Sequence, residues 1–236
     1  MSFWDITLEL LSGFGFTLAL FILTLIFAIP LGLAISFARM STIKPVQSVT
    51  KVFIWVIRGI PLMLLIFIIY YLPGLLGNGS YNIFNDLDLE FTKLAGSSEL
   101  LRYGSFLAVL IAFVINYSCY FAEIFRGGIE SIPQGQYEAG QVLGLTKSQI
   151  FTKVVLKQVI KRILPPMTNE IITLVKDTAL ANAIAIPEII LCAKDLASTK
   201  AIIWPLFYTA VFYLIFVGLI TIILGKAEKK LSYFKA

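Results

Sequence analysis

The chain has 236 residues, of which 58% are hydrophobic and 14% are charged, and its formal net charge is +5. A soluble globular protein has about half apolar and about 25% charged residues, so this composition excludes a disordered chain and argues against a water-soluble enzyme. The sequence contains no histidine, which excludes histidine-based acid–base catalysis and histidine-ligated metal sites.

Long uncharged runs predict membrane-spanning helices. Charged residues are absent from four stretches: residues 10–38, 59–85, 103–122 and 201–225. A helix needs about 20 mostly apolar residues to cross a bilayer, so we expect spans at about 14–37, 50–72, 104–125 and 204–225. A fifth expected span, 163–186, is apolar but contains Glu170, Lys176 and Asp177. The predicted fold is all-α: a polytopic membrane bundle of five transmembrane helices in a single domain, 1–236.

The basic residues predict the orientation of these helices, because Lys and Arg concentrate in cytoplasmic loops. Thirteen of the nineteen Lys and Arg residues lie in three segments that five spans place on the same side: 39–51, 126–162 and 226–236. Four lie on the other side: Lys93, Arg102, Lys194 and Lys200. We expect the N-terminus outside the cell and the C-terminus in the cytoplasm. Because the Lys and Arg residues concentrate in the loops on one side of the membrane, the net positive charge does not indicate nucleic-acid binding.

The second span is predicted to be interrupted and to lead into an acidic outer segment. Gly59, Ile60 and Pro61 fall near its cytoplasmic end, where proline removes a backbone donor and clashes with the preceding turn. The span is followed by an outer loop, 76–103, that holds four acidic residues: Asp86, Asp88, Glu90 and Glu99. This loop is either a contact surface for an external partner or a solvated connector.

The cytoplasmic segment 130–162 has the pattern of two short helices. Residues 136–143 predict the first helix, Gly144 breaks it, and Thr146 suits the N-cap of a second helix that runs from Lys147 towards Arg162. Apolar residues occupy one side of the second helix and lysines recur every fourth residue on another. Two amphipathic helices with a glycine hinge suit docking to another protein or lying on anionic lipid, and the pattern favours neither.

Two polar stripes occur within the predicted spans. Glu170 and Asp177 are seven residues apart, so they differ by roughly 20° around a helix, and Thr173 lies between them on the same face. Ionisable residues in a span usually face a cavity or a partner, and these two carboxylates would attract an ammonium or guanidinium group. Asn116, Tyr120 and Glu123 form a second stripe on the third span, at steps of four and three residues. Packed together, the two stripes would line a site near the bilayer midplane.

The same residues also have structural explanations. Either carboxylate of the fifth span could form an ion pair with Lys176 or Arg58 of this chain or of a second subunit. The polar residues of the third span could make an ordinary hydrogen bond between helices. For Glu123, which follows them on the third span, an i,i+3 ion pair with Arg126 is the simpler explanation.

Several motifs, in order along almost the whole chain, resemble those of a known family. Glu138, Ala139 and Gly140, with Gly144 four residues on, resemble the EAA loop of ABC-importer permease subunits. The surroundings are similar to the polar amino-acid permeases of the histidine/glutamine type, in six stretches: RGIPL at 58–62, AEIFRGGI at 122–129, QGQYEA at 134–139, ILPP at 163–166, NE at 169–170 and KDTAL at 176–180.

The resemblance implies a type I ABC-importer permease fold and the transport of a polar L-amino acid by alternating access. The intramembrane acids slightly favour a basic amino acid, with glutamine, glutamate or cystine as alternatives. The resemblance also implies that Glu170 and Asp177 contact the substrate. It further implies that the first helix of the cytoplasmic segment docks on the ATPase, through five residues: Glu138, Ala139, Gly140, Gly144 and Leu145.

The implied partners are a cytoplasmic ABC ATPase, a second copy or a homologue of the permease, an extracytoplasmic substrate-binding protein and the lipid of a bacterial cytoplasmic membrane. The chain lacks the G-x-x-x-x-G-K-[ST] phosphate loop, so we expect a partner to bind and hydrolyse ATP, and no enzymatic activity, cofactor or metal in this subunit. Two residues depart from the family pattern. Gly140 replaces an alanine, which would loosen the helix locally, and Lys157 replaces the usual proline, so no kink is required there.

Functions of two other classes fit the sequence less well. An intramembrane enzyme could use Glu170 and Asp177 for general acid–base chemistry, but the sequence offers no histidine partner and no obvious nucleophile. An ion-coupled secondary transporter is commonly built from inverted repeats, and the sequence has no such repeat.

Overall fold

The computed structural model describes residues 2–76, 82–94 and 102–231, and within these ranges every regular element is a helix. In chain order the elements are α1 (Phe3–Arg39), α2 (Lys44–Gly59), α3 (Leu62–Leu76), α4 (Ile83–Leu94), α5 (Tyr103–Glu130), α6 (Gln134–Val142), α7 (Lys147–Ile150), the π-helical turn η1 (Phe151–Val155), α8 (Leu156–Asp177), the 3-10 helix η2 (Thr178–Ile184), α9 (Ile189–Lys200) and α10 (Trp204–Leu231).

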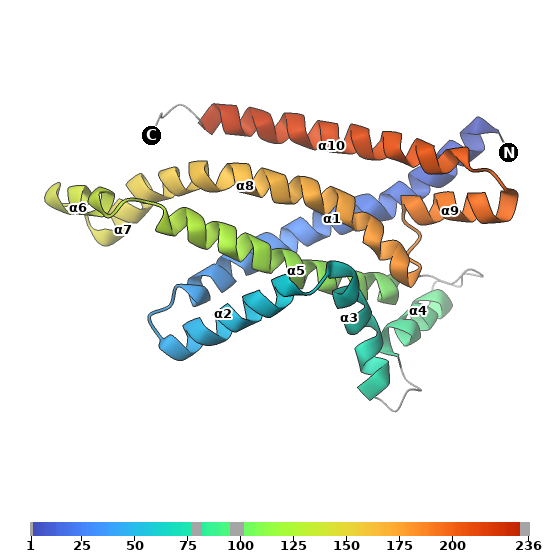
Figure 1. The fold of residues 1–236 in the computed structure, drawn as a ribbon, viewed down its shortest axis with the longest axis horizontal. Helices are drawn as coiled ribbons and strands as arrows, with labels where there is room; N and C mark the ends of the chain where they lie inside the picture. The colour runs from blue at the N-terminus through green and yellow to red at the C-terminus, as the bar shows by residue number, and fades with distance from the viewer. Residues whose placement is uncertain (1, 77–81, 95–101, 232–236) are drawn as a thin grey trace.

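The long helices run roughly lengthwise through the molecule. In Figure 1, α1, α5, α8 and α10 run along the length of the molecule, with α6 and α7 at one end and α9 and the start of α1 at the other. Among the described residues, α1, α5 and α10 are each long and apolar enough to cross a membrane, and α2 and α3 qualify together as one span bent by 104°. The predicted helical membrane bundle is therefore confirmed.

The predicted fifth span corresponds to α8 and η2. This stretch lies beside α5 and α10 (Figure 1), but α8 carries too many charged side chains to qualify by composition as a membrane helix. The count of five spans thus stays a prediction. Whether α8 crosses the membrane depends on how its charged residues are shielded from lipid.

Helices α1 and α5 make the most extensive helix–helix contact among the described residues, and small residues on α1 permit it. Thr24, Ala28, Gly32 and Ser36 recur at every fourth position of α1 and are all buried. A Cβ atom at Gly32 would lie 2.8 Å from both the Phe121 Cβ and the Ser118 carbonyl oxygen of α5. Small residues at such spacing let two helix backbones approach closely within a membrane.

The outer segment predicted as a loop contains helix α4, and one of its acids has a structural role. Asp88 is only 1% exposed. Its Oδ1 accepts hydrogen bonds from the backbone N–H groups of Gly104 and Ser105 at 2.6 and 3.1 Å, and its Oδ2 accepts from the Ser105 hydroxyl. The carboxylate thus satisfies N–H groups that the first turn of α5 leaves free. Asp86 and Glu90 remain exposed, whereas Glu99 lies outside the described residues.

The Gly32 contact generates a test. Replacing Gly32 with leucine forces a side chain into the α1–α5 interface, and overpacking of this kind typically costs about 1–3 kcal/mol. We expect Gly32→Leu to lower the thermal unfolding temperature of the purified protein. Gly15 lies on the same helix, and a Cβ atom there would meet no packed neighbour within 4 Å, so Gly15→Leu is the matched control. Equal unfolding temperatures for the two variants would contradict the packing account.

Candidate functional site

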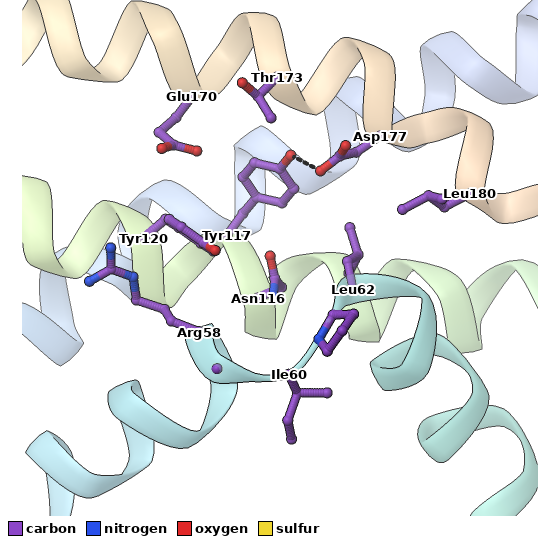
Figure 2. Close-up of a pocket in the computed structure, with 12 residues that line it drawn as sticks. Arg58, Ile60, Leu62, Asn116, Tyr117, Tyr120, Glu170, Thr173, Asp177 and Leu180 are labelled. Atoms are coloured by element: carbon purple, nitrogen blue, oxygen red, sulfur yellow. Dashed lines mark hydrogen bonds between the residues drawn. The ribbon is translucent and has the colours of Figure 1, made fainter.

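A cavity of about 500 Å³, open to the surface on one side and lined by both polar and apolar atoms, lies where four segments meet (Figure 2). The α2–α3 break contributes residues 58–62, and η2 contributes Leu180. Helices α5 and α8 contribute three side chains each: Asn116, Tyr117 and Tyr120 from α5, and Glu170, Thr173 and Asp177 from α8. All five residues that the sequence predicts to bind substrate therefore line the same cavity.

The break between α2 and α3 forms one wall of this cavity. Ile60 ends α2 in an extended conformation, with ψ at 130°, as expected of a residue that precedes proline. The Pro61 carbonyl then accepts from the Leu64 and Leu65 N–H groups at 2.9 and 3.1 Å, which starts α3 in a new direction. The predicted interruption is confirmed. It leaves Arg58 in the last turn of α2, where the helix dipole favours a cation.

Helix α5 supplies a second wall through side chains that differ in their burial. Asn116 is 5% exposed, and Tyr120 is partly buried. Tyr117, which the sequence analysis missed, is 1% exposed and also lines the cavity. Tyr117 lies three residues before Tyr120 and so neighbours it on the helix surface, whereas it is turned by about 100° from Asn116. An aromatic residue in an apolar helix gives no separate signal of a polar role.

Helix α8 places its polar residues opposite α5, as the seven-residue spacing predicts. Figure 2 shows Glu170, Thr173 and Asp177 pointing from α8 into the cavity. The Thr173 hydroxyl donates to the Asn169 carbonyl within the helix at 3.0 Å. Asp177 accepts a hydrogen bond from the Tyr117 hydroxyl, with 2.7 Å between the oxygen atoms. Glu170 makes no comparable hydrogen bond among the described residues.

Opposite charges face this cavity without pairing directly. The Arg58 guanidinium carbon lies 4.8 Å from the centre of the Tyr120 ring, a cation–π contact. Within residues 2–76, 82–94 and 102–231, neither Glu170 nor Asp177 forms an ion pair with Arg58 or Lys176. The described geometry therefore shows no ion pair within this chain that would explain the two acids, and a pair with a second subunit stays a prediction. The cavity instead presents one guanidinium and two carboxylates to whatever enters it.

Glu123 has a different role, and the simpler explanation for it is confirmed. Its Oε2 lies 2.6 Å from Nη2 of Arg126, three residues on, and its Oε1 lies 4.0 Å from Nε of Arg39 on α1. Arg126 also pairs with Glu130 at 2.5 Å. These residues form an ion network at the end of α5 that lies nearest to α6, outside the residues that line the cavity.

The cytoplasmic segment has the predicted helix–turn–helix form. Helix α6 ends in a Schellman motif: the Gly144 N–H donates to the Gln141 carbonyl at 2.9 Å and the Leu145 N–H to the Gly140 carbonyl at 3.1 Å. Gly144 has φ of +73°, the left-handed conformation that this motif requires. Thr146 caps α7 as predicted, because its Oγ1 accepts from the N–H of Gln149 at 3.3 Å.

The second predicted helix is longer than expected. The sequence predicts a helix over 147–162 and a separate span over 163–186, whereas α7, η1 and α8 follow one another without an intervening loop. The continuous stretch contains a π-helical turn, Phe151–Val155, just before Lys157. Lys157, one of the two residues that depart from the family pattern, therefore lies two residues after the end of the π-helical turn.

Gly140 is required by packing within this segment. It is buried, and a Cβ atom there would lie 2.6 Å from Cγ1 of Ile150. The missing side chain allows α6 to approach α7 closely, and the expected local loosening of α6 by Gly140 stays a prediction. Leu145 is partly buried against the same small core, which contains Ile132, Ile150, Val155 and Val159.

The outer surface of α6 and its turn carries exposed residues of two kinds. Glu138 and Ala139 are exposed, as a docking role requires. Val142 and Leu143, which the sequence analysis missed, are 88% and 77% exposed. Adjacent exposed apolar side chains at a protruding turn are typical of a surface that a partner covers.

Three comparisons with known proteins agree with this architecture. The family model described as binding-protein-dependent transport system inner membrane component matches residues 28–233. The chain is 32% identical to the L-cystine transport system permease protein TcyB of Bacillus subtilis, over 100% of this chain and 90% of that protein. It is 30% identical to the arginine transport system permease protein ArtQ of the same organism, over 94% and 92%.

The third comparison is structural. A chain from the crystal structure of an amino acid ABC transporter with histidines superposes with a TM-score of 0.76 and 29% sequence identity, covering 98% of this chain and 99% of that one. The likeness therefore extends along the whole bundle, including the elements that line the polar cavity.

Proposed function

This chain belongs to the family of inner membrane components of binding-protein-dependent transport systems, and we propose that its polar cavity is the site through which a polar L-amino acid passes. It is a permease subunit of an amino-acid ABC importer and a multi-pass protein of the cytoplasmic membrane. Membership of this family does not favour the two alternative functions, an ion-coupled secondary transporter and an intramembrane enzyme.

The observation that carries the proposal is that side chains of opposite charge line one cavity. An amino acid has a carboxylate and an ammonium group. Arg58 offers a guanidinium that can bind a carboxylate through two parallel hydrogen bonds, and Glu170 and Asp177 offer acceptors for ammonium or guanidinium groups. The cavity volume of about 500 Å³ lies within the range of about 300–1,000 Å³ typical of small-molecule sites.

The charge balance of the cavity favours a basic amino acid. Arg58, Glu170 and Asp177 together carry a formal charge of −1, which an amino acid with a neutral side chain, as a zwitterion, leaves without a cation. The side chain of arginine or lysine supplies that cation. Glutamine, glutamate and cystine are the alternatives, and the relatives named for cystine and for arginine support the amino-acid class without distinguishing between these substrates.

We propose that the turn after α6 docks on a cytoplasmic ABC ATPase, which binds and hydrolyses ATP. The support is the exposed surface formed by Glu138, Ala139, Val142 and Leu143, held in place by the buried contact of Gly140 with Ile150. Transport would also need a second permease chain and an external substrate-binding protein. In alternating access, ATP-driven closure of the ATPase pair would push these turns together and open the cavity outward.

The proposed orientation places α6 and α7 inside the cell and the start of α1 outside. Basic residues at the α6 and α7 end support this orientation. At the opposite end, the Phe3 ring stacks on Trp204 at 5.6 Å and Trp204 contacts Tyr208 at 5.7 Å. Aromatic clusters of this kind are enriched at membrane–water boundaries, which supports a boundary at this level of the bundle.

The charge of Glu170 generates the first functional test. In proteoliposomes containing the whole transport complex, we expect Glu170→Gln to reduce arginine uptake by about tenfold or more, the usual consequence of losing a hydrogen bond between charged groups. Glutamine uptake should change little. Glu90→Gln, on the exposed face of α4, is the control. Equal losses for arginine and glutamine would count against recognition of substrate charge by Glu170.

The left-handed backbone conformation of Gly144 generates a second functional test. A β-branched residue there carries a conformational cost of roughly 1–2 kcal/mol, so Gly144→Val should distort the turn and raise the number of ATP molecules hydrolysed per amino acid imported. Asparagine tolerates this conformation, so Gly144→Asn should retain coupling. Normal coupling in Gly144→Val would show that the turn is not the joint with the ATPase.

A further inference from the structure

Packing fixes the position of Tyr117, a cavity residue that belongs to none of the sequence motifs. Its ring lies 6.2 Å from Phe113 in a near-parallel arrangement and 6.1 Å from Phe121, both on α5. The side chain is 1% exposed. Because neighbouring rings hold the aromatic ring, the hydroxyl oxygen has little freedom to move.

That fixed hydroxyl makes the two acids of the cavity inequivalent. It donates to Oδ2 of Asp177 at 2.7 Å and so links α5 to the last residue of α8. Asp177 therefore has one oxygen held in place and the other free to accept a further hydrogen bond. Glu170 has no such restraint from the described part of the chain, although the two acids share one helix face (Figure 2).

Resting on the proposed function, we propose that Tyr117 is a positioning residue that aims the Asp177 carboxylate at the cationic side chain of a basic substrate. A carboxylate that is already oriented loses less conformational freedom when the cation arrives. Without the Tyr117 hydroxyl, Asp177 can turn to other rotamers or to water. A neutral substrate makes no charged contact with Asp177, so the loss of this restraint affects it far less.

Tyr117→Phe removes the hydroxyl oxygen and keeps the ring that packs against Phe113 and Phe121. With the complete complex in proteoliposomes, we expect the KM for arginine to rise about tenfold, as for the loss of a hydrogen bond to a charged group. The KM for glutamine should change much less, because glutamine brings no cationic side chain to Asp177, and kcat should stay similar for both substrates.

The matched control is Tyr213→Phe. The Tyr213 side chain on α10 is partly buried against the main hydrophobic core, and Tyr213 is not among the residues that line the cavity. This variant removes the same atom from a packed tyrosine outside the cavity, so it should leave the arginine-to-glutamine ratio of KM values unchanged.

A second mutation separates positioning from a direct contact between Tyr117 and the substrate. In an Asp177→Asn background there is no charge to aim, so adding Tyr117→Phe should not raise the arginine KM further. A further tenfold rise there would overturn the proposal, because Tyr117 would then act without the Asp177 charge. Tighter arginine binding by Tyr117→Phe alone would also overturn it, since the hydroxyl would then be restraining Asp177 away from the substrate.

The outcomes for Tyr117 and for the proposed function can be told apart. If Glu170→Gln loses arginine uptake selectively and Tyr117→Phe leaves the ratio of KM values unchanged, the cavity recognises charge and only the role of Tyr117 is wrong. If the wild-type complex transports no basic amino acid, the proposed substrate class and the role of Tyr117 both fail.

Discussion

The cost of placing charge in hydrocarbon governs this structure. A charged side chain in a membrane span is tolerated where it faces a cavity or a partner, and α8 carries Glu170 and Asp177 on one face. That face is turned towards α5 and the α2–α3 break, where Tyr117 donates a hydrogen bond and Arg58 supplies an opposite charge. These charged and polar side chains thus meet around one cavity, where α5, α8 and the α2–α3 break come together.

Two local features make room for this cavity and hold its walls. Small residues on α1, among them Gly32, bring α1 against α5 and fix the position of the central helix. Pro61 redirects the chain by 104° between α2 and α3, so that a bent backbone segment, and not a continuous helix, faces the polar residues. Between α3 and α5, the buried carboxylate of Asp88 holds α4 over the first turn of α5.

The sequence predicted those parts of the fold and the site whose signal is local. Uncharged runs identified α1, α5 and α10, and Pro61 identified the break. Polar residues such as Glu170 and Asn116 stand out in apolar helices, so they could be selected by spacing alone.

Features that depend on contacts between distant residues could not be predicted. Tyr117 looks like any core aromatic residue until its hydroxyl is seen beside Asp177. The acidic composition around α4 suggested a loop, because the backbone groups that Asp88 caps lie 16 and 17 residues away. The contact of Gly140 with Ile150 likewise requires knowledge of the turn between α6 and α7. The continuity of α7, η1 and α8 was obscured by the charges and prolines along that stretch.

The most direct test of the central claim is whether the transported molecule occupies this cavity. In a complex whose permease carries Cys119→Ala, Cys192→Ala and Thr173→Cys, the rate at which a small thiol reagent labels position 173 can be measured with and without saturating amino acid. Occupancy predicts that the substrate slows labelling at position 173 and leaves labelling of a Glu90→Cys variant on exposed α4 unchanged. An unchanged rate at position 173 while substrate is being transported would contradict the account.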